Sequence, residues 1–222
     1  MFHVEQALFV DVLVEGASTF GIEFNESQVL AFSSYYRELD RWNQKVNLIS
    51  AQGAKEIAIK HFLDSLLYGQ AMEQRKNASL LDVGSGAGFP GLPLKILAPE
   101  LHVTLLEPSK KKTSFLRHII GTLDLQNVWV VSESLRDFSR EASRHGRFSY
   151  LTTRAVKAQQ ILPFSASLLS EQGRVIFSLG RTLDCDPRQY GLKASRQIKY
   201  ELPGGFGQRV LTILERAGAA AA

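Results

Sequence analysis

Apolar positions in the first third of the chain repeat with the period of a helix. One predicted helix starts after Asn25 or Ser27, either of which can cap it. Its apolar residues are Leu30, Tyr35, Leu39 and Trp42. A second predicted helix carries Ile57, Ile59, Phe62, Leu63, Leu66 and Leu67. Residues 1–76 are therefore expected to be helical.

From residue 79 onward, short apolar runs alternate with helical segments. Five runs have the pattern of strands, at residues 79–83, 102–106, 127–131, 150–153 and 174–179, the last after a turn at 171–173. Helices are predicted over 92–97, 109–123 and 156–169, with a kink or restart at Pro163. This alternation predicts an α/β fold with a mostly parallel, doubly wound sheet. Residues 198–202 and 209–214, joined by a glycine-rich loop, are expected to close it as an antiparallel pair.

A glycine-rich segment, DVGSGAGFPG at residues 82–91, joins the first strand to the first helix of this sheet. Glycines let a ligand approach the backbone without a Cβ clash, and the first crossover of such a sheet is a usual ligand site. Gly84, Gly86 and Gly88 fit the G-x-G-x-G pattern of an adenosyl ligand, whereas a start one glycine later fits the dinucleotide pattern. In the dinucleotide pattern the first glycine directly follows the strand, but counted from Gly84 the last glycine of that pattern is replaced by Phe89. Pro90 and Pro93 also disturb the start of a phosphate-binding helix. S-adenosylmethionine is therefore favoured over NAD.

Glu107 ends the second strand, 23 residues after Gly84. A carboxylate at this place can accept hydrogen bonds from both hydroxyls of a ribose. The alternative is a helix cap or a surface acid, because Pro108 and Ser109 follow at once.

Composition narrows the class of protein further. With 222 residues, 45% apolar and 22% charged, the chain is neither disordered nor fibrous. Cys185 is alone, so no internal disulfide forms and a reducing, cytoplasmic compartment is expected. No apolar run has the length of a membrane span. Residues 1–77 carry seven Lys and Arg against ten Asp and Glu, whereas residues 78–222 carry 19 against 12, which hints at a polyanionic partner for the second part.

The residues after the fourth strand limit the methyl acceptor. Methylation of a base amino group usually goes with an Asn/Asp-Pro-Pro-aromatic tetrapeptide, and that of a pyrimidine carbon with a cysteine. The chain has Leu-Thr-Thr-Arg-Ala at residues 151–155 instead, and Cys185 lies in a predicted loop. A guanine N7 carries a lone pair and no proton, so its methylation needs no base. Arg154 can bind phosphate, guanine O6 or the methionine carboxylate, or can be a surface residue. No catalytic side chain and no metal site are expected.

Several segments together resemble a known family. They are residues 39–50 (LDRWNQKVNLIS), 60–66 (KHFLDSL), 81–94, 115–116, 153–155 and 208–210. Over about residues 25–216 the chain is similar to the bacterial glucose-inhibited division protein B family, methyltransferases of guanine N7 in small-subunit ribosomal RNA. The resemblance implies a Rossmann-like, S-adenosylmethionine-dependent methyltransferase fold with an N-terminal helical extension. It also implies a cytoplasmic, monomeric enzyme that acts on the RNA of the decoding region.

The resemblance also implies roles for individual residues. Gly84 and Phe89 line the cofactor site, Leu135 and Arg136 pack on or bond the adenine, and Arg154 lies at the cofactor or acceptor mouth. Two positions depart from the family: it usually has Glu in place of Arg136, and Lys-Gly after the fifth strand, where this chain has Leu-Gly-Arg at residues 179–181. These departures leave the expected cofactor unchanged but affect the RNA contacts.

Four residues are expected to contact the RNA: Arg154, Arg209, Lys110 and His61. The three lysines at residues 110–112 begin a helix, where positive charge is unfavourable and an anionic partner more plausible, although a solvated run is the alternative. His61 and Asp64 are three apart on one helix face and can pair, either facing the acceptor or joining the helices to the sheet.

Three functions remain open on the sequence alone: an RNA guanine-N7 methyltransferase, a methyltransferase of a protein or small molecule, and a non-catalytic RNA- or nucleotide-binding regulator. The glycine loop with Glu107 argues against the regulator, and the basic second part argues for RNA. The expected organisation is a helical cap over residues 1–77, a methyltransferase domain over 78–216 and a tail over 217–222. The alternatives for the substrate are naked RNA, the ribosomal subunit and an assembly intermediate.

Overall fold

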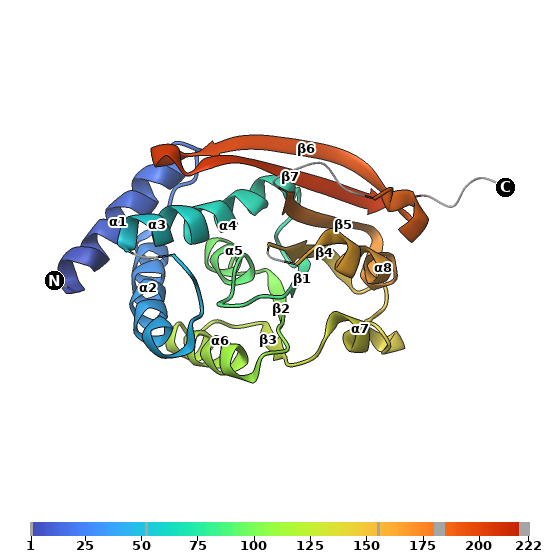
Figure 1. The fold of residues 1–222 in the computed structure, drawn as a ribbon, viewed down its shortest axis with the longest axis horizontal. Helices are drawn as coiled ribbons and strands as arrows, with labels where there is room; N and C mark the ends of the chain where they lie inside the picture. The colour runs from blue at the N-terminus through green and yellow to red at the C-terminus, as the bar shows by residue number, and fades with distance from the viewer. Residues whose placement is uncertain (1, 52, 155, 180–184, 218–222) are drawn as a thin grey trace.

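The computed structural model describes residues 2–51, 53–154, 156–179 and 185–217. They form a seven-stranded sheet, which helices flank (Figure 1). The strand order is β3-β2-β1-β4-β5-β7-β6. The strands are β1 (Ser79–Val83), β2 (His102–Leu106), β3 (Val128–Val131), β4 (Phe148–Thr153), β5 (Leu169–Leu179), β6 (Leu192–Leu202) and β7 (Gly207–Arg216). The first five are parallel, and β7 runs antiparallel to both β5 and β6. The expected doubly wound α/β fold is confirmed.

The helices before the sheet are α1 (Phe2–Ser18), α2 (Glu26–Val46), α3 (Ala54–Ile57), the π-helix η1 (Ala58–Leu63), α4 (Asp64–Leu67) and the 3-10 turn η2 (Tyr68–Ala71). The helices that connect its strands along the chain are α5 (Gly91–Leu97), α6 (Lys110–Thr122), α7 (Leu135–Phe138), η3 (Ala142–Arg144), α8 (Ala158–Leu168), η4 (Pro187–Tyr190) and η5 (Pro203–Gly205). None of the helices in these ranges has the length and apolar character needed to cross a bilayer.

Two hydrophobic cores lie on the two faces of the sheet. On one face, Leu80 and Leu105 join the buried residues of α1, α2, α5 and α6 in one cluster. On the other face, Leu81 and Leu106 join those of α7 and α8. Adjacent residues of one strand thus serve opposite cores, as the two-residue period of a strand requires. The first helices share a core with the sheet, and Figure 1 shows α1 and α2 on the opposite side from α7 and α8.

Three predicted details need correction. The helix over residues 57–67 is interrupted by the π-helical turn η1. Residues 171–173 lie inside β5 as an irregularity in its pairing with β4, so the strand begins at Leu169 rather than after a turn. The closing strands are also longer than their apolar runs, because most residues of β6 are exposed and only a few are buried.

Candidate functional site

The glycine loop after β1 has the backbone conformation that its sequence requires. Gly84, Gly86 and Gly88 have φ values of 69°, 59° and 97°, in the region that favours glycine. The amides of Gly84 and Ser85 donate to the carbonyl of Leu106 at 2.8 and 3.3 Å. The loop is therefore fixed against the end of β2, at the carboxyl edge of the sheet, where ligands of such sheets bind.

The three glycines differ in what a side chain would meet. A Cβ at Gly86 would meet only the Gly84 carbonyl at 3.9 Å, so Gly86 borders open space. A Cβ at Gly88 would come within 2.5 Å of Leu92 and 2.6 Å of the Tyr35 hydroxyl. Gly86 therefore leaves room for a ligand, whereas Gly88 leaves room for the protein core.

Asp82, at the end of β1, stabilises the glycine loop through buried hydrogen bonds. Its Oδ2 accepts from the amide of Gly91 at 3.0 Å, and its Oδ1 from the hydroxyl of Thr152 at 3.4 Å. Asp82 is fully buried, and burial raises the pKa of its carboxyl to about 7. Its role is to connect β1, the start of α5 and β4.

Glu107 lies beside the loop with its carboxylate buried. Oε2 accepts from the amide of Gly86 at 2.9 Å, and Oε1 from the amide of Ser109 at 2.9 Å. Each oxygen keeps a second lone pair, so the carboxylate can still accept from ligand hydroxyls. Glu107 is not the N-cap of α6, which is Ser109 and has no side-chain cap hydrogen bond.

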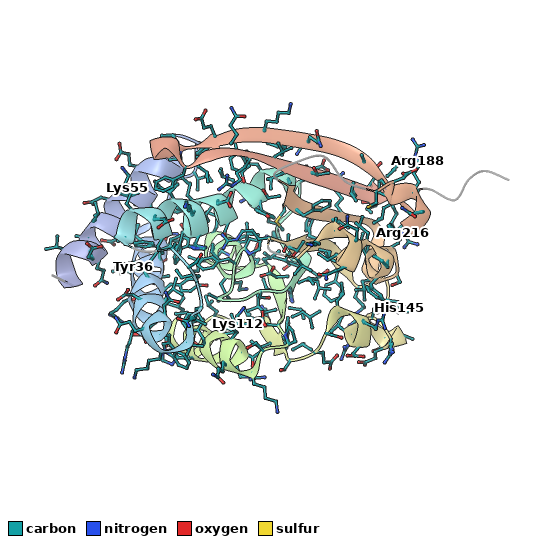
Figure 2. All side chains as sticks on the ribbon, viewed as in Figure 1. Tyr36, Lys55, Lys112, His145, Arg188 and Arg216 are labelled. Carbon is teal, nitrogen blue, oxygen red and sulfur yellow. The ribbon has the colours of Figure 1, made fainter. Side chains whose placement is uncertain are left out.

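A cavity of about 710 Å³ opens at this edge of the sheet. It brings together Gly84, Glu107, Leu135 and Arg136, four of the expected cofactor residues, and Lys112 of α6. Lys112 is labelled in Figure 2. The other lining residues of the cavity are Val83, Leu106, Pro108, Glu133, Ser134, Val156, Gln159, Gln160, Pro163 and Phe164. The volume is that of a small-molecule site, and its mostly apolar walls with a few polar groups are typical of one.

Phe89 lies in the core rather than in the lining of this cavity. It is 4% exposed, and its ring stacks on Tyr35 with centroids 5.6 Å apart. Among the described residues, Gly86, Gly88 and Arg154 are also absent from the lining. The ring of Phe89 packs in the core beneath the glycine loop, and its role at the cofactor site stays a prediction.

Arg154 connects the end of β4 to the first helices. Its Nη1 donates to the carbonyls of Lys60 and His61 at 3.0 and 3.2 Å, and its Nη2 to Nδ1 of His61 at 2.6 Å. Its guanidinium carbon lies 5.0 Å from the ring centroid of Phe89. Because arginine only donates, His61 carries its own proton on Nε2. Burial, with the nearby charge of Arg154, lowers the pKa of His61 to about 3.

Asp64 and His61 do not pair with each other, contrary to the sequence-based suggestion. Asp64 is buried, and its Oδ1 accepts from the hydroxyl of Tyr200 at 2.7 Å. Its Oδ2 lies 3.9 Å from Nε of Arg209, whose side chain is 27% exposed. The π-helical turn and α4 thus direct His61 toward β4 and Asp64 toward the closing strands.

The remaining sequence-predicted residues are placed as follows. Lys110 is exposed at the first turn of α6, next to the cavity residue Lys112. Cys185 is a free, half-buried thiol packed against the core on the face of the sheet that carries α7 and α8. Arg181 lies outside the described residues, as does the tail from residue 218.

Most of the residues that line the cavity were not predicted from the sequence. Glu133 and Ser134 follow β3, and Gln159 and Gln160 belong to α8 after β4. No motif marks these positions. Applying the carboxyl-edge rule to every strand, and not only to the first two, would have pointed to them.

Solved structures place the fold in a known class. TrmN from Thermus thermophilus has a TM-score of 0.57 at 16% identity, with 69% of this chain and 48% of that chain covered. A SAM-dependent methyltransferase from Aquifex aeolicus has a TM-score of 0.52 at 14% identity, with 72% and 93% covered. The fold is the Rossmann-like fold of S-adenosylmethionine-dependent methyltransferases.

Sequence comparison narrows this class to one family. A family model described as GidB, rRNA small subunit methyltransferase G, matches residues 28–191. Ribosomal RNA small subunit methyltransferase G of Roseiflexus castenholzii is 39% identical over 79% of this chain and 75% of that protein. The protein of the same name from Dehalococcoides mccartyi is 38% identical over 92% and 90%. The chain therefore belongs to the GidB family of rRNA small subunit methyltransferases.

Proposed function

We propose that the protein transfers a methyl group from S-adenosylmethionine to N7 of a guanine in small-subunit ribosomal RNA. The observation that carries the RNA substrate is the family match over residues 28–191, together with relatives of that name along nearly the whole chain. The relatives' names give the class of RNA. The N7 position is what the resemblance to the family implies, and it fits the end of β4, where residues 151–155 lack the tetrapeptide of amino-group methylation and a cysteine.

The residues at the carboxyl edge fit the cofactor. Gly86 borders open space beside the buried Glu107, whose carboxylate can accept from the ribose hydroxyls. Leu135 supplies an apolar wall for the adenine, and Arg136 adjoins it. Gly84 and Gly88 shape the loop, and Phe89 supports it from the core. When bound, S-adenosylmethionine supplies an electrophilic methyl group on its sulfonium.

No side chain near the end of β4 needs to act as a base. His61 accepts from Arg154 and has a lowered pKa, Asp64 is bonded to Tyr200, and Asp82 holds the amide of Gly91. A guanine N7 presents its lone pair without a proton to remove. The contribution of the protein is then to hold acceptor and donor in line, which is itself a large catalytic effect.

We assign the RNA contacts to cationic groups around this edge. Arg209 and Lys110 are at least partly exposed there, and Arg154 with His61 lies where β4 meets the helices. Residues 1–77 act as a helical cap on a methyltransferase domain of residues 78–216, with a tail from residue 217. The enzyme works as a monomer in the cytoplasm.

The test is methyl transfer from labelled S-adenosylmethionine to naked small-subunit RNA and to the assembled subunit, with the modified base identified by mass spectrometry. Label in 7-methylguanine is expected. The matched control replaces guanine by 7-deazaguanine, which lacks only the acceptor nitrogen and should take no label. Label in another base, or in the 7-deazaguanine RNA, would contradict the N7 assignment.

A further inference from the structure

A second hollow, of about 670 Å³, lies away from the cofactor cavity on the face of the sheet that carries α7 and α8. We call it the β3 groove; it is lined by the starts of β1, β2 and β4, by β3 and by the segment between β3 and β4. That segment contains only the four-residue α7 and the three-residue η3. Because so short a segment covers only part of the face, the start of the edge strand β3 stays open.

Two aromatic rings form the floor of the β3 groove. The side chain of Trp129 is 51% exposed, far more than is usual for a tryptophan in a strand. Its ring lies nearly parallel to that of His102, with 16° between the planes and 6.0 Å between the centroids. The pair is a flat aromatic surface that the rest of the described protein leaves half open.

The charge of the β3 groove is of one sign. None of the described residues that line it is acidic, whereas Arg144, Arg147 and His102 line it. Arg144 is held in ion pairs by Glu133 and Glu141. Arg147 is exposed, and its guanidinium has no hydrogen bond or ion pair among the described residues. One free cation thus lies beside an open aromatic surface.

We propose that the β3 groove binds an unpaired stretch of the RNA substrate, with a base stacked on Trp129 and a phosphate on Arg147. This inference rests on the proposed function, because it supplies a second contact to the same RNA. Unpaired bases stacked on aromatic rings, with cations on the backbone, are how proteins hold single-stranded RNA. A protein partner fits less well, since the groove has polar walls at Ser79 and Thr104 and an uncompensated cation.

Helix α7 lies between the β3 groove and the cofactor cavity, and no residue lines both. Leu135 and Phe138, the two ends of α7, face the cavity and the groove respectively. Arg144 of the groove binds Glu133 of the cavity, with Nη1 and Oε2 2.7 Å apart. Substitutions of Trp129 and Arg147 should therefore change RNA binding without removing a cofactor contact.

The test measures the affinity of the full-length protein for a labelled single-stranded RNA oligonucleotide, a duplex of the same sequence and the isolated small subunit. Trp129→Ala should raise the single-strand Kd about tenfold and leave the duplex Kd unchanged. Trp129→Phe should restore most of the affinity, whereas Trp129→Leu, which is apolar but cannot stack, should not. Arg147→Ala should lower the slope of log Kd against log salt by roughly 0.7.

Two exposed residues outside the groove serve as matched controls, Leu30→Ala and Arg188→Ala (Figure 2), which should change neither quantity. Unchanged single-strand Kd and salt slope in Trp129→Ala and Arg147→Ala would overturn the inference. So would a loss confined to the assembled subunit, which would indicate a protein contact. Should Trp129→Ala unfold, Arg147→Ala decides alone. Methyl transfer by the wild-type protein is measured in parallel: its absence refutes the proposed function, whereas its presence with unaffected variants refutes only the groove.

Discussion

At the scale of single residues, the glycine loop shows that one residue type serves different physical needs within five positions. Gly84 makes room for Val156, whose methyl group would lie 2.5 Å from an added Cβ. Gly88 makes room for Leu92, and Gly86 borders open space. The G-x-G-x-G pattern alone does not separate these needs, because all three positions also have positive φ.

Substitutions at Gly86 and Gly88 distinguish a glycine that borders the ligand space from one that borders the core. Gly86→Ala should weaken S-adenosylmethionine binding at least tenfold, because its Cβ enters the space left for the ligand, and should cost only the roughly 1 kcal/mol of a left-handed non-glycine residue. Gly146→Ala is the matched control, since its φ is 67° and nothing lies within 4 Å of the added Cβ. Gly88→Ala should instead lower the melting temperature markedly, through Leu92 and Tyr35. Calorimetric titration and thermal melting measure the two effects, and unchanged affinity in Gly86→Ala would refute the cofactor assignment.

Asp82 predicts a pH dependence of stability. Burial raises its pKa to about 7 in the folded chain, so between pH 4 and pH 7 the folded state keeps a proton that the unfolded state has lost. The free energy of unfolding should then fall with rising pH, by at most about 1.4 kcal/mol per pH unit, and level off above pH 7. Asp82→Asn keeps an acceptor for the amide of Gly91 and should lack this component. Urea unfolding of both proteins at several pH values between 4 and 8 gives the difference.

Wild type must be compared with Asp82→Asn because His61 changes the free energy of unfolding with pH in the opposite direction. Its pKa is lowered to about 3, so the unfolded chain binds its proton first and stability rises with pH up to about 6.5. The two contributions partly cancel in the wild-type protein. A difference between wild type and Asp82→Asn that does not change with pH would show that Asp82 is ionised throughout.

At the scale of elements, helix α2 starts with a complete capping box. The side chain of Asn25 accepts from the amide of Gln28 at 2.9 Å, and the amide of Asn25 donates to Oε1 of Gln28 at 3.0 Å. The side chain of Gln28 also donates to the carbonyls of Ile96 and Leu97 at the end of α5. The cap therefore fixes both the start of α2 and its contact with the sheet domain.

Asn25→Ala should destabilise the protein by about 1 kcal/mol, or roughly 2–4 °C in melting temperature for a chain of this size. Asn25→Asp keeps the acceptor and should recover most of this loss. Ser27→Ala distinguishes the two caps left open by the sequence, because the Ser27 hydroxyl only donates to Oδ1 of Asn25. A larger loss for Ser27→Ala than for Asn25→Ala would contradict the observed cap.

Elements with a local signal were predicted closely, and those set by tertiary contacts were not. The boundaries of β1 and β2 agree with the apolar runs, because buried parallel strands are apolar at nearly every position. The π-helical turn η1 has no such signal. It is accompanied by tertiary bonds, since Arg154 donates to the carbonyls of Lys60 and His61. The site residues differ in the same way. Glu107 directly follows a predicted strand and was predicted, whereas Gln159 belongs to a helix and reaches the cavity only through the tertiary fold.

At the scale of the whole molecule, the acidic first part and the basic second part meet at the carboxyl edge of the sheet. Arg154 uses three hydrogen bonds there to hold the helices, whereas Arg209 lies 3.9 Å from Asp64 at the start of β7 and stays partly exposed. The two arginines, equal candidates on the sequence, thus differ in how free they are to meet RNA. Their loss should have different consequences.

Arg209→Ala should lower the slope of log Kd against log salt for the small-subunit RNA by roughly 0.7–0.9, because one phosphate contact fewer displaces counterions. Its affinity for S-adenosylmethionine should not change, since Arg209 is absent from the described lining of the cofactor cavity. Arg154→Ala should lower the melting temperature, because the carbonyls of Lys60 and His61 lose their donor. Arg188→Ala, exposed on η4, is the control for a general loss of charge and should keep the slope of the wild type. If Arg209→Ala also keeps that slope, Arg209 serves only to balance the charge of Asp64, and the RNA path does not cross the start of β7.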